Sequence, residues 1–143
     1  MTIQQLTCQT LTYEQIEVGM IEQLSRTVST EMVEAYARLV GDVNPVHLDE
    51  AFAAKTIFRR RIAHGMLPAG LISAILGTRL PGPGSIYLSQ ELEFKRPVYL
   101  DDTIIAKVEV IEKYEQKKVK LHTWVENQAG QIVVDGQALV LVR

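Results

Sequence analysis

Roughly the last sixty residues of this 143-residue chain have the character of β-strands, and part of this region alternates between apolar and polar positions, which is the period of a half-buried strand. The alternation is clearest from Val119 to Glu126, where every second position is apolar or Thr and the residues between are Lys120, His122 and Trp124. Three further segments have a similar character and are separated by turn residues: 85–94, 103–112 and 132–142. The pattern therefore predicts four antiparallel strands in succession.

The first half of the chain shows helical spacing in two places. A short helix is predicted to begin after the N-cap Ser29 and to end at Gly41. Its apolar stripe consists of Met32, Ala35, Tyr36, Leu39 and Val40. A second helix is predicted from His64 to about Gly77, with Pro68 in its first turn. Apolar side chains surround this second helix, so we expect it to be buried on nearly all sides.

The order of these elements indicates the fold class. A possible strand at 20–28 precedes the helices, and a further helical turn is expected at 49–54. We therefore expect an α+β fold in which an antiparallel sheet wraps around a long central helix. No repeat or linker divides the chain, so residues 1–143 are expected to form a single domain. Such a sheet leaves open edges, which favours a homodimer.

Composition narrows the classes of function without selecting one. The formal net charge of −2 does not favour a nucleic-acid partner. Cys8 is the single cysteine, which predicts a reducing compartment. The first residues lack the pattern of a secretory signal, and the apolar stretch 65–76 is shorter than the roughly 20 residues of a membrane span. We therefore expect a cytoplasmic protein with no membrane partner.

The stretch VGDVNPVH, residues 40–47, places Asp42 and His47 on either side of Pro45. Proline fixes its own φ and restricts the residue before it, so this turn is predicted to be stiff and to leave the first helix as a loop. An Asp and a His near one water molecule can act as base and acid. The same residues are also common in turns that bond only their own backbone, and the spacing alone leaves both interpretations open.

The segment Gly41 to His47, with Tyr36 upstream and Ala53 downstream, resembles the hydratase-2 motif of MaoC-like dehydratases. The resemblance continues through residues 62–67, 80–88 and 94–98 and covers roughly residues 17 to 143, with residues 1–16 as an N-terminal extension. It is strongest toward the small single-domain (R)-specific enoyl-CoA hydratases. The resemblance implies a hot-dog fold, a homodimer, an acyl-CoA substrate, and neither a cofactor nor a metal.

The resemblance also implies roles for individual residues. Asp42 and His47 would hold a water molecule that adds to C3 of a trans-2-enoyl thioester, and a proton would go to C2. The product would be an (R)-3-hydroxyacyl thioester. The amide of Gly65 would bond the thioester carbonyl, Asn44 would orient the Asp–His pair, and Ser73 would be a supporting polar group.

Other polar residues have simpler interpretations. His64 is expected to serve in packing or capping, although it is also a candidate substrate-binding residue. The run Arg59, Arg60 and Arg61 is either a solvated turn or a contact for CoA phosphates. His122 is expected to be solvated. Asp42, His47 and His64 lack the close sequence spacing of a metal site.

Three alternatives remain open from the sequence. The first is a dehydratase acting on acyl carrier protein, for which the same arginines would form a basic rim. The second is a thioesterase, which the lack of any Asp or Glu from His64 to Leu80 disfavours. The third is a non-catalytic acyl-CoA-binding domain, which the intact Asp42 and His47 disfavour. The sequence indicates neither acyl chain length nor pathway.

Overall fold

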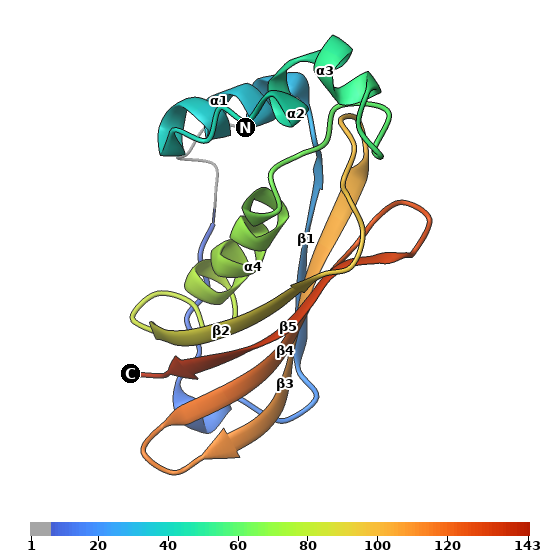
Figure 1. Cartoon of the computed structure of the whole chain (residues 1–143). Coiled ribbons are helices and arrows are strands. Elements are labelled where there is room, and N and C mark those ends of the chain that lie inside the picture. Colours follow the sequence, from blue (N-terminus) through green and yellow to red (C-terminus); the bar gives the residue numbers. More distant parts are fainter. Residues whose placement is uncertain (1–6) are drawn as a thin grey trace.

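The computed structural model describes residues 7–143. Three short helices form a layer beyond the N-terminal end of a longer helix, α4, and α4 lies in the curve of one sheet (Figure 1). In chain order the elements are η2 (Tyr13–Gln15), β1 (Ile21–Thr27), α1 (Thr30–Val40), α2 (Pro45–Leu48), α3 (Glu50–Ala54), α4 (Met66–Thr78), β2 (Ile86–Phe94), β3 (Thr103–Tyr114), β4 (Lys118–Glu126) and β5 (Ile132–Leu141). This arrangement confirms the expected α+β fold with a sheet wrapped around a central helix.

The capping residues of α1 behave as predicted. The Ser29 side chain accepts a hydrogen bond from the Met32 amide at 3.2 Å, which satisfies one of the free donors of the first turn. Gly41 ends the helix with φ 81°, in the left-handed region where glycine lacks the steric penalty of a side chain. Val33 and Ala37 are the buried residues of the helix. The end of α1 is therefore determined locally, and it sets where Asp42 begins.

The chain after Gly41 differs from the prediction, because α2 takes the place of a simple loop. The Asn44 side chain accepts from the Val46 amide at 3.2 Å, and Pro45 occupies the first helical position. Both are ordinary start signals for a helix, but four residues are too few to show a helical period. As a result His47 lies on a helical turn and not in an irregular loop.

The five strands are antiparallel and are ordered β1-β3-β4-β5-β2. β2 pairs with β5 at one edge, although it precedes β3 in the chain, and β1 pairs with β3 at the other edge. The predicted alternation is confirmed in β4, where every second residue is buried against the core, and β3 shows the same pattern as far as Val110. Close approach of β2 and β5 requires Gly136, because a Cβ there would lie 1.8 Å from the Glu91 carbonyl oxygen.

The central helix α4 is buried except along one face. The expectation that it is buried on nearly all sides is wrong for that face. Leu67, Ile72, Ile75 and Leu76 belong to the core, and α4 packs against β1, β3 and β4. A stripe along the remaining side is exposed in the single chain: Met66, Gly70, Ser73 and Gly77. The stripe follows helical spacing. Glycine and serine occur at both exposed and buried positions, so the sequence did not indicate that this face is exposed.

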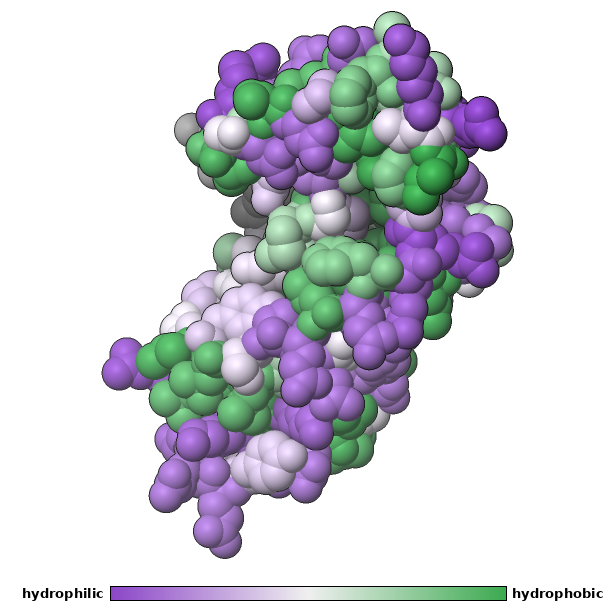
Figure 2. Space-filling view, in the orientation of Figure 1, coloured by the Kyte–Doolittle hydropathy of each residue, from purple (hydrophilic) through white to green (hydrophobic). Residues whose placement is uncertain are grey.

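Apolar side chains also reach the surface elsewhere. Figure 2 shows hydrophobic surface on the layer of short helices and beside the end of the sheet near the C-terminus. The exposed apolar residues of these regions include Leu39, Val43 and Ile57 in the helical layer and Ile86, Tyr87 and Leu88 on β2. Within residues 7–143, no helix has both the length and the apolarity that a membrane crossing needs.

Candidate active site

Asp42 and His47 are brought together by the end of α1 and the start of α2. The left-handed Gly41 turns the chain, and the capped start of α2 then carries His47 back toward it. Asp42 is exposed, whereas His47 is 7% exposed. The pair thus joins a water-accessible carboxylate to a desolvated imidazole, which is the expected combination for acid–base work on one water.

The imidazole of His47 is held in one tautomer. Its Nδ1 lies 2.7 Å from the Ile62 carbonyl oxygen, which can only accept, so Nδ1 carries the proton and Nε2 of the neutral ring is a free base. Burial lowers the pKa of His47 below its usual value, and the nearby His64 lowers it further, against the raising effects of the Ile62 bond and of Asp42. His47 is therefore neutral and able to accept a proton at neutral pH.

Asp42 takes part in the local turn as well. Its Oδ1 accepts from the Asn44 amide at 3.3 Å, which is the backbone-bonding arrangement of the simpler interpretation. A carboxylate has a second oxygen and several lone pairs, so this single bond leaves it able to accept from a water molecule. Asn44 uses its side chain to cap α2, and in this way it orients the element that carries His47.

Gly65 is the N-cap residue of α4, and its conformation is ordinary right-handed helix, with φ −57° and ψ −35°. The backbone therefore does not demand glycine there. Space beside it is limited, because a Cβ would lie 3.0 Å from Cε1 of Phe94 and the Phe94 ring would have to shift. Among residues 7–143 no acceptor bonds the Gly65 amide. A free amide at a helix N-terminus is suited to bind a carbonyl oxygen that gains negative charge.

His47 and Gly65 both line a cavity of about 370 Å³, whereas Asp42 is not part of its lining. His47, His64 and Gly65 line it together with Phe58, Phe94 and the cations Lys95 and Arg96. The sequence did not assign a role to Phe94, Lys95 or Arg96, although they lie in one of the stretches that carried the family resemblance. The sequence of an aromatic residue, two cations and Pro97 could have indicated a binding role. The same sequence is equally typical of a solvated strand end.

The three arginines after α3 do not act as one patch. Arg59 is exposed with φ 69°, and the Arg60 guanidinium lies 4.0 Å from the centre of the Tyr99 ring. Arg61 turns inward, where its Nε donates to the His47 carbonyl oxygen at 2.7 Å. One guanidinium nitrogen of Arg61, Nη2, is buried without a partner within the described part of the chain. A phosphate contact stays a prediction for Arg59 and Arg60, whereas Arg61 supports α2.

Ser73 lies apart from this cavity. It lines a second groove, of about 640 Å³, beside the exposed face of α4, together with Tyr36, Met66, Tyr87 and Gln90. Tyr36 links the two hollows, because its ring also packs against His64 with centroids 4.7 Å apart. The supporting role of Ser73 therefore stays a prediction.

His122 differs from the expectation of a simply solvated residue. Its Nε2 lies 2.7 Å from Asp135 Oδ1, and its ring stacks on Trp124 with centroids 4.4 Å apart. All three side chains lie on the outer face of the sheet, because the alternate residues of β4 face the core. His122 is thus a part of the outer surface and not of the candidate active site.

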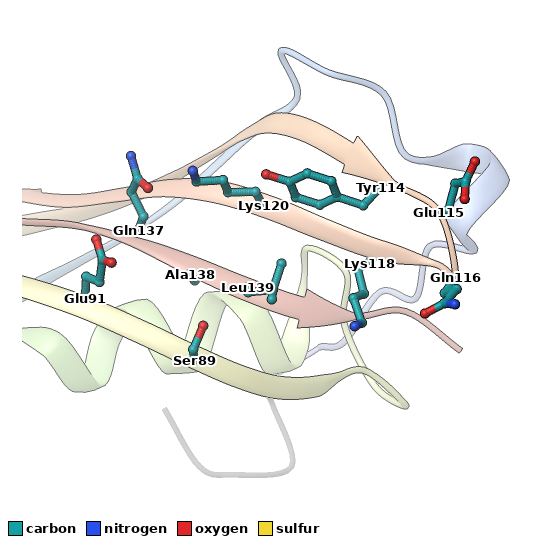
Figure 3. Close-up of a pocket in the computed structure, with 10 residues that line it drawn as sticks. All are labelled: Ser89, Glu91, Tyr114, Glu115, Gln116, Lys118, Lys120, Gln137, Ala138 and Leu139. Carbon is teal, nitrogen blue, oxygen red and sulfur yellow. The ribbon is translucent and has the colours of Figure 1, made fainter.

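A larger hollow, of about 680 Å³, also lies on the outer face (Figure 3). Its lining includes Tyr114, Lys118, Lys120, Glu91 and Gln137, and Figure 3 shows α4 on the opposite side of the strands. None of the residues with candidate acid–base or carbonyl-binding roles takes part in it. The candidate active site is therefore the smaller cavity beside α4.

The side chains of Asp42, His47 and His64 could together hold a metal ion, since one ligand atom of each lies within 4.8 Å of the others. Their separation along the sequence disfavours a metal site, but the fold removes that separation. Nδ1 of His47 and Nε2 of His64 donate to carbonyl oxygens, so each neutral ring keeps one lone pair on its other nitrogen. The same closeness also suits one shared water molecule.

An antiparallel sheet around a central helix, with an acid–imidazole pair at the N-terminal end of that helix, defines a protein of the hot-dog class. Comparison with known proteins makes the assignment more specific. The family model described as a MaoC-like domain matches residues 13–130. The chain therefore belongs to the MaoC-like family.

Individual relatives cover nearly the whole chain. A 3-hydroxybutyryl-CoA dehydratase from Methylorubrum extorquens is 47% identical over 132 residues, which are 92% of this chain and 84% of the relative. An (R)-specific enoyl-CoA hydratase from Aeromonas caviae is 48% identical over 128 residues, 89% of this chain and 96% of the relative. The solved structure of an (R)-hydratase from Pseudomonas aeruginosa has a TM-score of 0.89 at 46% identity and covers 93% of this chain and 86% of that one.

Proposed function

We propose that this protein catalyses the reversible, (R)-specific hydration of trans-2-enoyl-CoA to (R)-3-hydroxyacyl-CoA. The observation that carries the proposal is the grouping of an acid, a base and a donor: His47 and the free amide of Gly65 line one cavity, and a carboxylate oxygen of Asp42 lies within 4.8 Å of a ring nitrogen of His47. Family membership and the names of the relatives agree with this reaction class.

The reaction follows from the groups present. The Gly65 amide donates to the thioester carbonyl oxygen, which draws electrons from C3 and stabilises the enolate-like state. His47 Nε2 accepts a proton from the water held between it and Asp42, and the water oxygen bonds to C3. A proton is then delivered to C2 from the same face. One water molecule supplies both the hydroxyl and the added hydrogen, so the balance needs no cofactor.

The cations at the cavity support a phosphate-bearing carrier. Lys95 and Arg96 line the cavity itself. Arg59 and Arg60 are exposed and directly follow Phe58, another residue of the cavity lining. Arginine binds phosphates well because its planar fork donates two parallel hydrogen bonds. We assign these cations to the phosphates of CoA. The same charges would also attract an acidic acyl carrier protein, which is the second candidate carrier.

We also propose that the functional unit is a cytoplasmic homodimer. The exposed stripe of α4 and the apolar residues Ile86, Tyr87 and Leu88 on the edge strand β2 would be covered by a second copy. An open sheet edge favours this kind of pairing. The groove that contains Ser73 lies beside the same surface, so the acyl chain would run near the subunit boundary.

One assay tests the proposed activity. Purified protein is mixed with crotonyl-CoA, loss of the enoyl absorbance is followed, and the product is analysed on a chiral column. We expect the (R)-3-hydroxy product with the wild type and a rate about 10²- to 10⁴-fold lower with Asp42→Asn. Crotonyl carried on acyl carrier protein is compared at equal concentration, and a faster reaction there would replace CoA as the preferred carrier. The S product, or release of a free thiol, would refute the proposal.

A further inference from the structure

We infer that His64 is a positioning residue, which fixes Asp42, the His47 ring and the Gly65 amide relative to one another. The inference rests on the proposed function and adds a role that differs from both substrate binding and simple packing. His64 reaches Asp42 through a hydrogen bond, His47 through ring contact and Gly65 through the chain.

The first contact is with the backbone of Asp42. His64 Nε2 lies 2.9 Å from the Asp42 carbonyl oxygen, and a carbonyl oxygen can only accept, so Nε2 carries a proton and donates it. The two residues are 22 positions apart in the chain. Within residues 7–143, this is the one hydrogen bond from a side chain of the segment 55–65, before α4, to the turn at residues 41–44.

The second contact is with the imidazole of His47. The two rings have centroids 3.8 Å apart at an interplanar angle of 31°, while Tyr36 of α1 packs on His64 with a centroid distance of 4.7 Å. The His64 ring is therefore enclosed between α1 and α2, and it is only 2% exposed. The His64 ring and the hydrogen bond from His47 Nδ1 to the Ile62 carbonyl oxygen together restrict the orientation of the His47 ring.

The third contact is covalent, since His64 directly precedes Gly65. The His64 carbonyl oxygen accepts from the Leu67 amide at 3.0 Å, which opens α4. The amide of the preceding Ala63 donates to the Val98 carbonyl oxygen at 2.7 Å, so the backbone on the N-terminal side is also fastened. A displaced His64 would consequently displace the carbonyl-binding amide as well.

Packing alone does not account for a histidine at this position. Nδ1 of His64 is buried without a hydrogen-bond partner in the described part of the chain. An unsatisfied buried polar atom is costly, and phenylalanine would fill a similar space without it. The group that phenylalanine lacks and that the structure uses is the Nε2–H bonded to Asp42.

Two substitutions separate the two side-chain contacts. His64→Phe keeps a ring between Tyr36 and His47 but removes the bond to Asp42. His64→Gln keeps a donor but removes the ring contact. The matched control is His122→Gln, because that histidine lies on the outer face of the sheet. Each variant is assayed with crotonyl-CoA for kcat and KM, and each is compared by thermal melting.

We expect both His64 variants to lower kcat on the order of 10- to 100-fold, because small displacements of catalytic groups have effects of this size. We expect KM and the Kd of the unreactive butyryl-CoA to change less than about threefold, since His64 is not the carrier-binding group. His122→Gln should match the wild type. A large rise in Kd with unchanged kcat would show substrate binding instead and overturn the inference.

The pH profile distinguishes positioning from a loss of packing. The groups that face His47 are Asp42, His64 and, at its carbonyl, Arg61. Because His64 lowers the pKa of His47, His64→Phe should raise that pKa and move the acid limb of kcat/KM to higher pH. An unmoved limb, with activity falling in parallel with melting temperature across the variants, would mean that His64 only packs.

The failure of this inference can be told apart from failure of the proposed function. If the wild type does not hydrate crotonyl-CoA, the proposed function fails, and the role of His64 is then read by NMR titration of the His47 ring. The wild-type and His64→Phe proteins should differ in the His47 pKa in the direction given above. If they do not differ, His64 does not position His47.

Discussion

Replacing Gly65 tests the carbonyl-binding amide, and the structure allows two replacements to be compared. Gly65→Pro removes the amide donor, while Gly65→Ala keeps the donor and adds only a Cβ. The observed φ of −57° lies inside the range that proline requires, roughly −65 ± 15°. Proline is therefore tolerated by the backbone of residue 65 itself, and α4 gains no broken hydrogen bond because an N-cap amide is free.

The expected magnitudes differ. Loss of one preorganised donor to a developing oxyanion costs about 2.7–4 kcal/mol, or on the order of 10² to 10³ in kcat. Alanine brings a Cβ to 3.0 Å from the Phe94 ring, so that ring must move by a few tenths of an ångström. Phe94 is 55% exposed and can move outward, so we expect Gly65→Ala to cost well under the proline variant in kcat and less than about 1 kcal/mol in stability.

Crotonyl-CoA kinetics beside a thermal melt check both variants. Proline also restricts His64, the residue before it, so a third protein carries glycolic acid at position 65. The resulting ester removes the N–H without that restriction, and it weakens the His64 carbonyl oxygen as the acceptor of the Leu67 amide only modestly. We expect the ester and proline proteins to lose similar activity while folding normally. An ester protein with wild-type kcat would refute the carbonyl-binding role of Gly65. If Gly65→Ala lowered kcat as much as Gly65→Pro does, the cause would be steric conflict with Phe94 and not the missing amide donor.

Further predictions concern the other groups of the site. Asp42→Asn and His47→Gln should each reduce kcat about 10²- to 10⁴-fold, and the double variant should be little worse than the weaker single one, because both act on one water. Losses that multiply would show independent roles. Because the pKa of His47 is lowered, the acid limb of kcat/KM should lie below pH 6.5 for the wild type, and a limb above that value would contradict the role of burial. Lys95→Ala with Arg96→Ala should raise KM for crotonyl-CoA by about tenfold with kcat nearly unchanged, and the effect should weaken as salt concentration rises. An unchanged KM would place the phosphates elsewhere. Sedimentation at micromolar concentration should show a dimer, and a monomer would refute the proposed assembly.

Much of the local structure was predictable because its causes lie close together in the chain. Ser29 and Gly41 marked the ends of α1 through capping chemistry that involves only neighbouring residues. The alternation in β4 predicted which side chains face the core, since strand geometry alone sends successive residues to opposite faces. The Asp42–His47 turn was found for the same reason, and the family resemblance supplied its expected chemistry.

Other features depended on contacts between distant segments. The pairing of β2 with β5 results from how the sheet closes around α4, and alternation contains no information about which strand is the neighbour. The exposed side of α4 was not predicted, because glycines such as Gly70 and Gly77 are compatible with both the core and the solvent. Consecutive arginines looked like one basic patch, but Arg61 bonds the His47 carbonyl because the chain leaves α3 past α2.

The candidate active site shows the same division. The sequence by itself determined a capped turn with an acid and an imidazole, because proline, asparagine and glycine act within a few bonds. Only the tertiary structure decided that the free nitrogen of His47, the Gly65 amide and the His64 ring share one place, since that requires segments 15 to 22 residues apart to pack together. Burial then lowers the pKa of His47, and burial is a property of the folded surroundings rather than of the residue.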